Sequence, residues 1–152
     1  LSASIIINHV KDGVELGKKY RLPKKILDII MQHHGDTLVS YFYHKAKKDN
    51  GETNEKDFKY DGPKPLTKEA AIVMLADSTE AAVRSIKEPN RENIEAMIKN
   101  IIDGKLNSNQ LSECDLTFKN LDEIKDAFLS VIMGIFHERI EYPEDESVKG
   151  DA

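Results

Sequence analysis

Residues 67–87 read TKEAAIVMLADSTEAAVRSIK, and Ala70 to Ala76 within them form an uninterrupted apolar run. A run of this kind, flanked by polar residues at helical spacing, predicts a helix from about Thr67 to Lys87. Because apolar residues occupy all sides of that helix, we expect most of its surface to be enclosed. The helix should therefore lie at the centre of the fold.

Asp77 follows the apolar run directly. An ionised carboxylate buried without a partner costs several kcal/mol, so we expect a cation beside Asp77. Arg84 is the alternative partner, but it lies seven residues on, about 10 Å further along the helix axis. Direct pairing is therefore not expected, and Arg84 is better placed to contact an anionic ligand whose other end lies near Asp77.

The segments on both sides also carry apolar residues at helical spacing, and none shows the sustained alternation of a half-buried strand. The prediction is an all-α fold with a long polar surface loop over residues 49–65. Besides the helix at Thr67–Lys87, the expected helices are Ser2–Tyr20, Pro23–His34, Thr37–Lys48, one from the cap at Asn90 to about Gly104, and a last one capped by Asn120.

The composition indicates one globular domain of 152 residues, 39% apolar and 32% charged. No apolar run approaches the ~20 residues needed to cross a bilayer, so any membrane attachment is expected outside this sequence. A net charge of -5 gives no basic field, so a nucleic acid polymer is not an expected partner. The single cysteine, Cys114, excludes an internal disulfide and fits a reducing, cytosolic compartment.

The two ends of the chain suggest a domain of residues 1–143 cut from a longer protein. The sequence begins at Leu1 rather than Met, and helical spacing begins at once. Residues 144–152 are acidic and polar without an apolar stripe, so we expect a disordered tail there.

Three histidines are candidate metal ligands. His9 shares a helix face with the isoleucines before it and should point inward, where an inward histidine is either a ligand or a satisfied core residue. If His33 and His34 are both helical, their side chains point in directions ~100° apart. Both can then face one cavity only where the end of the helix abuts that cavity. Otherwise they form a polar helix terminus. We expect His44 and His137 to be structural or surface residues.

Several motifs, taken in order, resemble one family. They are INHVKDG (residues 7–13), QHHG (32–35), YFYHKA (41–46), GPKP (62–65), LADS (75–78), AAVRS (81–85), ECDLTF (113–118) and MGIFH (133–137). Together they are similar to the HD domain of the seven-transmembrane cyclic di-AMP phosphodiesterases, over nearly the whole chain. The resemblance implies an HD-domain helical bundle, here lacking its N-terminal helices, and the cytosolic domain of a membrane-anchored bacterial protein.

The resemblance also implies a metal site. The family holds two transition-metal ions, typically iron or manganese, with an early histidine, a His-Asp pair, a further histidine, a His-His pair and a late aspartate. By motif, His9, His33, His34 and Asp77 match the last four positions. The early histidine and the His-Asp pair have no counterpart, and we expect them to precede Leu1. The fragment alone is then expected to hold no metal ion or one, and to be inactive.

The implied reaction is hydrolysis of cyclic di-AMP to linear pApA. Two metal ions would activate a bridging water and neutralise charge as the 3′ oxygen leaves. Asp77 is the implied catalytic residue, and Arg84 and Lys64 are the expected contacts to phosphate. Two alternatives stay open: a nucleotide-responsive binding or interaction module without catalysis, and an HD phosphohydrolase that acts on another nucleotide.

Overall fold

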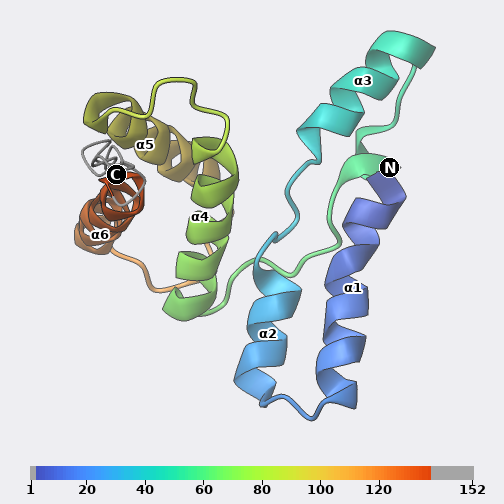
Figure 1. Ribbon diagram of the computed structural model, residues 1–152. Helices are drawn as coiled ribbons and strands as arrows, with labels where there is room; N and C mark the ends of the chain where they lie inside the picture. Colours follow the sequence, from blue (N-terminus) through green and yellow to red (C-terminus); the bar gives the residue numbers. More distant parts are fainter. Residues whose placement is uncertain (1–2, 138–152) are drawn as a thin grey trace, which may run out of the picture.

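The computed structural model describes residues 3–137, which form six α-helices and one short 3-10 helix (Figure 1). The elements are α1 (Ala3–Lys19), α2 (Lys24–Gln32), α3 (Ser40–Asn50), η1 (Glu55–Phe58), α4 (Lys68–Val83), α5 (Arg91–Asn107) and α6 (Phe118–His137). Within these residues there is no strand, and a single antiparallel bridge joins Leu38 to Lys59. The all-α prediction is confirmed. The predicted tail, residues 144–152, lies outside the described residues.

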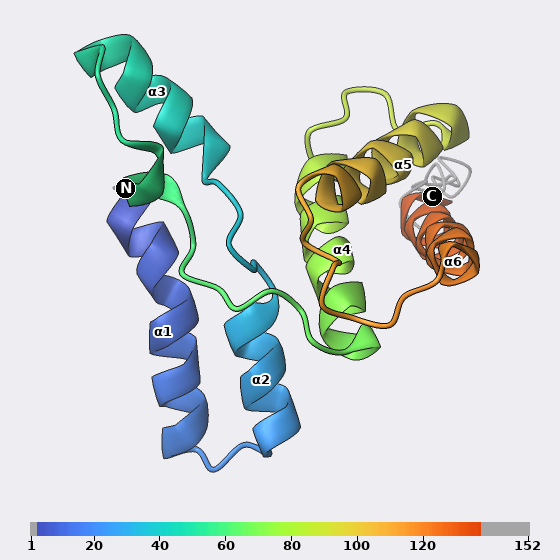
Figure 2. The same cartoon turned by 180° about the vertical axis from the view of Figure 1, so that it is seen from behind.

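Helix α4 occupies the middle of the molecule, between the α1–α2 hairpin and the pair α5 and α6 (Figures 1 and 2). It packs against α2 on one side and against α5 on the other. Most of the hydrophobic core comes from three helices: Ala71, Met74 and Leu75 of α4, Ile94, Ile98 and Ile102 of α5, and Leu121, Ile124 and Leu129 of α6, with Leu111 added by the segment between α5 and α6. The predicted central position of this helix is confirmed.

The predicted enclosure of α4 is wrong. Ile72 and Val73, in the middle of the apolar run, are each 37% exposed. The reason is that the packing partners of α4, α2 and α5, leave part of its surface to solvent. An apolar run therefore identified the right helix without identifying how many of its sides are covered.

Two glycines bring α1 close to α2. Gly13 and Gly17 follow His9 at intervals of four residues, so all three lie on one face of α1. A Cβ at Gly13 would lie 3.1 Å from Cγ2 of Ile30, and one at Gly17 would lie 2.6 Å from Cδ2 of Leu27. This close approach places His9 beside the end of α2.

Several helix ends differ from the predicted ones. Helix α2 ends at Gln32 rather than His34, α4 ends at Val83 rather than Lys87, and α5 continues past Gly104 to Asn107. Helix α6 begins earlier than predicted, because the hydroxyl of Thr117 accepts a hydrogen bond from the N–H of Asn120 at 3.1 Å and so performs the capping assigned to Asn120.

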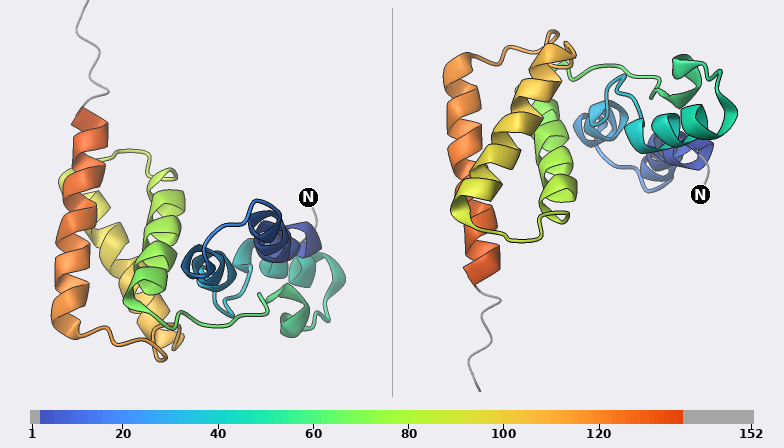
Figure 3. Two further views of the ribbon diagram at one scale, coloured as in Figure 1. Left: turned by 90° about the horizontal axis from the view of Figure 1, so that it is seen from below. Right: turned by 90° about the horizontal axis from the view of Figure 1, so that it is seen from above.

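Helix α3 stands at the periphery and packs against η1, at the opposite end of the molecule from α5 and α6 (Figure 3). The segment between α3 and α4 is largely loop, as predicted, although it contains η1. In the described part of the chain, no helix is long and apolar enough to cross a membrane.

Candidate metal centre

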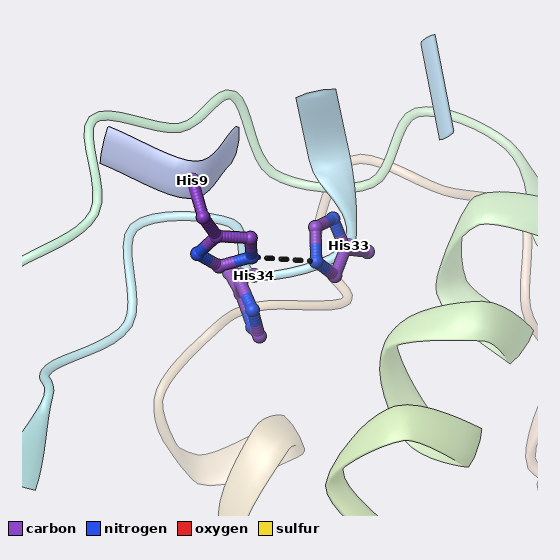
Figure 4. A group of neighbouring side chains, drawn as sticks. All are labelled: His9, His33 and His34. Carbon is purple, nitrogen blue, oxygen red and sulfur yellow. Dashed lines mark hydrogen bonds between the residues drawn. The ribbon is translucent and has the colours of Figure 1, made fainter. Parts of the chain in front are cut away.

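Three imidazoles from two helices meet at one point. His9 comes from the middle of α1, and His33 and His34 come from the turn that ends α2 (Figure 4). One ring nitrogen from each lies within 4.8 Å of the others. Three of the four residues that the resemblance implies as ligands therefore lie together, and their role in binding metal stays a prediction.

The hydrogen bonds of His9 and His33 fix which nitrogen faces the centre. Nδ1 of His9 contacts the carbonyl oxygen of Ile6, and Nδ1 of His33 lies 2.7 Å from the carbonyl oxygen of Ile30. A carbonyl oxygen only accepts, so in each neutral ring Nδ1 carries the proton and Nε2 keeps a lone pair. The backbone thus orients both rings, as carbonyls do for histidines that bind metals.

The two Nε2 atoms lie 3.3 Å apart, the approach marked by the dashed line in Figure 4. Two lone pairs cannot hydrogen-bond to one another, so while both Nδ1 atoms donate to the backbone this is not a hydrogen bond between neutral rings. A cation coordinated by both nitrogens satisfies both lone pairs. The donor set therefore fits a transition metal, for which imidazole is a preferred ligand.

His34 completes the group as a neutral ring. Its ring stacks on that of Tyr60, with centroids 4.3 Å apart, and lies 4.0 Å from the centroid of His33. Burial, together with the charges of His33, His9 and Lys105, lowers the pKa of His34 to about 3. Although Nδ1 of His34 lies 3.8 Å from Oδ2 of Asp77, the two do not form an ion pair at neutral pH. A neutral imidazole is the form that binds metals.

The turn that carries the two histidines is held by two buried glutamines. The side-chain oxygen Oε1 of Gln32 accepts a hydrogen bond from the N–H of Leu66 at 2.9 Å, just before α4. The amide of Gln110, 3% exposed, accepts from the N–H of Asp36 at 3.2 Å and donates to Oδ1 of Asp36 at 2.6 Å. The turn is thereby attached both to the start of α4 and to the segment between α5 and α6.

Residues 2–82, more than half of the chain, match the HD domain family. The chain belongs to the HD domain family.

Sequence and structure comparisons agree with this assignment. The chain is 52% identical over 144 residues to the cyclic-di-AMP phosphodiesterase PgpH of Bacillus subtilis and 46% identical over 145 residues to that of Listeria monocytogenes. Each alignment covers 95% of this chain and 20% of the relative. The chain therefore spans about a fifth of the length of these curated relatives.

The fold also matches solved structures of an HD domain. The crystal structure of the L. monocytogenes PgpH HD domain has a TM-score of 0.83 and 44% identity, covering 89% of this chain and 63% of that one. The same domain in complex with cyclic di-AMP also has a TM-score of 0.83, with 45% identity, 88% of this chain and 62% of that chain. The predicted family and the HD-domain bundle are confirmed.

One expectation about the ligands of this HD domain needs correction. His9 was expected to point into the core, but it is exposed, and the neighbouring Ile5 is 58% exposed. Its ring instead lies beside the ring of His33, at the end of α2. His33 and His34 lie at the end of α2, where the expected condition for facing one cavity is met: their ring centroids are 4.0 Å apart, and both join the group with His9.

Asp77 lies at the edge of the histidine group. Its side chain is 47% exposed, so the expected burial of this carboxylate is wrong, because the sides of α4 that are packed are those facing α2 and α5. It is not one of the residues whose ligand atoms lie within 4.8 Å of one another. Its 3.8 Å approach to His34 is what supports a role at the centre. That role stays a prediction.

The predicted phosphate contacts of the HD domain are both engaged with carboxylates. Arg84 forms an ion pair with Glu80, one turn earlier in α4, and its side chain is 76% exposed. Nζ of Lys64 lies 4.0 Å from Oδ2 of Asp36. Their roles toward substrate stay predictions. His44 is exposed, as expected, whereas the side chain of His137 lies outside the described part of the chain.

Sequence reasoning missed Tyr60 and Lys105. Tyr60 stacks on His34 from a loop, and no spacing rule connects the two. Lys105 did carry a signal: it lies three residues after Ile102, where the buried stripe of α5 would continue. A lysine in an apolar position is a candidate functional residue, because burying an ammonium without a partner is costly.

Proposed function

We propose that this chain is part of a metal-dependent phosphodiesterase that hydrolyses cyclic di-AMP to linear pApA. The observation that carries the proposal is the set of facing imidazole nitrogens of His9, His33 and His34. They occur in an HD domain that is 45% identical to one solved in complex with cyclic di-AMP. We further propose that Asp77 is the fourth ligand.

The ligand types agree with iron or manganese, which accept imidazole and carboxylate together. When bound, such ions supply Lewis acidity and lower the pKa of a coordinated water. The residues of this chain do the rest. Backbone carbonyls orient His9 and His33, burial keeps His34 neutral, and Asp77 adds negative charge beside it.

Two ions are proposed for the complete domain, with the additional ligands outside these 152 residues. Lys64 and Arg84 are proposed to contact the phosphates, which requires each to exchange its present carboxylate partner for substrate. Membrane anchorage is proposed through segments outside this chain, with this domain in the cytosol. A nucleic acid polymer is not a proposed partner, since a net charge of -5 gives no overall basic field.

The test compares two histidine variants in the complete protein, loaded with manganese. His33→Ala removes one of the facing nitrogens, so the affinity for manganese should fall by about 10- to 100-fold or more, and turnover of cyclic di-AMP should be lost with it. His44→Ala changes an exposed histidine outside the group and should leave both unchanged. Chromatography of the product distinguishes pApA from other nucleotides.

The outcomes separate the proposal from its alternatives. Tight binding of cyclic di-AMP without turnover in the metal-loaded parent would favour a nucleotide-responsive binding module. Turnover of another nucleotide in preference to cyclic di-AMP would favour a different phosphohydrolase. Equal turnover by His33→Ala and the parent would exclude this metal centre.

A further inference from the structure

Lys105 lies in the last turn of α5, on the side that faces the histidine turn. It is half-buried and lines a cavity of about 470 Å³. Asp36 and Gln110, which hold the turn after His34, line the same cavity. The cavity therefore opens directly beside the residues that carry the metal candidates.

The ammonium of Lys105 is electrostatically part of this site. Its charge contributes to lowering the pKa of His34, after the larger effects of burial and the two other histidines. Burial lowers the pKa of Lys105 itself, and the carboxylate of Asp77 acts in the opposite direction. The charge of Lys105 thus acts on His34, and the carboxylate of Asp77 acts on Lys105.

Three cations are candidates for contacting an anionic substrate here, and two of them already have carboxylate partners. Lys64 approaches Asp36, and Arg84 pairs with Glu80. Among the residues that the structure describes, Lys105 forms no salt bridge within 4.0 Å. A half-buried ammonium without a close counter-ion loses hydration that only an anion or strong acceptors would replace.

We propose that Lys105 contacts a phosphate oxygen of the substrate at the metal centre, and that the adjoining cavity receives the nucleoside attached to that phosphate. This inference rests on the proposed phosphodiesterase function for the nucleoside part. The phosphate contact itself rests on the half-burial of Lys105 and on its place in the cavity wall beside Asp36 and Gln110, which hold the histidine turn. The cavity lining offers amide, hydroxyl and carboxylate groups, from Asn100, Ser108 and Asp36 among others, that can hydrogen-bond to a ribose or a base.

The test uses the complete protein loaded with manganese, with inorganic phosphate as the first probe and cyclic di-AMP as the second. Lys105→Met keeps the length of the side chain and removes its charge, whereas Lys105→Arg keeps the charge. Lys99→Met is the matched control, because Lys99 is an exposed lysine of the same helix. Calorimetry gives the phosphate affinity, steady-state kinetics give KM and kcat, and metal analysis gives the manganese content.

Lys105→Met should weaken phosphate binding and raise KM for cyclic di-AMP by about tenfold or more, with the manganese content unchanged. Lys105→Arg should recover part of the affinity, and Lys99→Met should behave as the parent. Phosphate affinity within twofold of the parent would overturn the inference, and so would a loss that merely follows a loss of manganese. Failure of the parent to bind phosphate at all would overturn it too.

The two probes keep this inference distinct from the proposed function. If the parent binds phosphate through Lys105 but does not hydrolyse cyclic di-AMP, the substrate assignment fails and the phosphate contact stands. If cyclic di-AMP is hydrolysed with equal KM by the parent and Lys105→Met, the function stands and the contact fails.

Discussion

The histidine rings are oriented by the helices from which they come. Nδ1 of His9 and of His33 each contacts the carbonyl oxygen three residues earlier, so no additional side chain is needed to fix these two rings. Preorganised ligands lose little conformational freedom when a metal binds. The third ring, His34, is fixed by its stack on Tyr60. The site therefore needs little rearrangement to accept an ion.

Among the residues at the site, Asp77 gives the sharpest mutational test. In the complete protein, Asp77→Ala should lower turnover of cyclic di-AMP by about 100-fold or more, because it removes the carboxylate nearest the histidine group. Its free energy of unfolding should change by no more than about 0.5 kcal/mol, since a 47% exposed side chain contributes little to packing.

The matched control is Glu69→Ala, which removes an exposed carboxylate in the first turn of the same helix. It should keep parental turnover. Assays at saturating manganese and thermal unfolding of both variants give the comparison. Parental turnover in Asp77→Ala would exclude this carboxylate from the reaction.

Residue types and order were enough to identify the candidate ligands, but not their surroundings. His9, His33 and His34 were predicted from their motifs, and they do meet. The burial of Asp77 was predicted from the apolar run before it and was wrong, because burial depends on which neighbouring helices cover α4. The stack of Tyr60 on His34 joins residues far apart in sequence and leaves no periodic signal.

Among the elements, the turn after α2 determines whether the two adjacent histidines serve one site. Had α2 continued through His34, the side chains would diverge by about 100°. The helix instead ends at Gln32, and Gly35 takes a φ of 56°. Glycine at that point was a visible signal for a helix end. The end came two residues earlier than predicted because the side-chain oxygens of Gln32 and Gln110 accept tertiary hydrogen bonds that hold the turn. Sequence periodicity does not report such bonds.

Gly35→Ala should therefore damage both stability and metal binding. A Cβ at Gly35 would collide with the amide oxygen of Gln110 and lie 3.0 Å from Cε of Met74. The control is the same substitution in a Gln110→Ala background, where the colliding amide is absent. The backbone penalty for alanine at this positive φ, about 1–2 kcal/mol, is the same in both backgrounds.

The difference between the two backgrounds isolates the collision. In denaturant unfolding, Gly35→Ala should cost at least about 1 kcal/mol more in the parent than in the Gln110→Ala background, and in the parent it should weaken manganese binding. Equal costs would mean that Gln110 moves aside freely. The turn would then not depend on the contact with the segment between α5 and α6.

Over the whole molecule, one helix joins two groups of helices. Helix α4 contributes to the main core with α5 and α6, and it packs against α2, whose end carries two of the metal candidates. The prediction of an all-α fold followed from helical spacing in every segment. The relative placement of the α1–α2 hairpin did not, since it depends on the contact of Gly13 and Gly17 with side chains of α2. The HD-domain bundle was predicted from the family resemblance, because periodicity alone does not place the helices relative to one another.

The metal content of the 152-residue chain tests how much of the centre it carries. Two divalent cations about 3.5–4 Å apart repel strongly unless anionic ligands lie between them. In the described part of the chain the centre offers three neutral imidazoles and the half-exposed carboxylate of Asp77 at its edge. One negative charge is too little to offset that repulsion. The purified chain should therefore retain at most one manganese or iron ion, with negligible turnover of cyclic di-AMP.

Removing that ion with a chelator should leave the helical content unchanged, because the core of α4, α5 and α6 contains none of the metal candidates. Metal analysis and circular dichroism measure these two outcomes, and close to two ions per chain would mean that further ligands come from another part of the sequence or from a second copy.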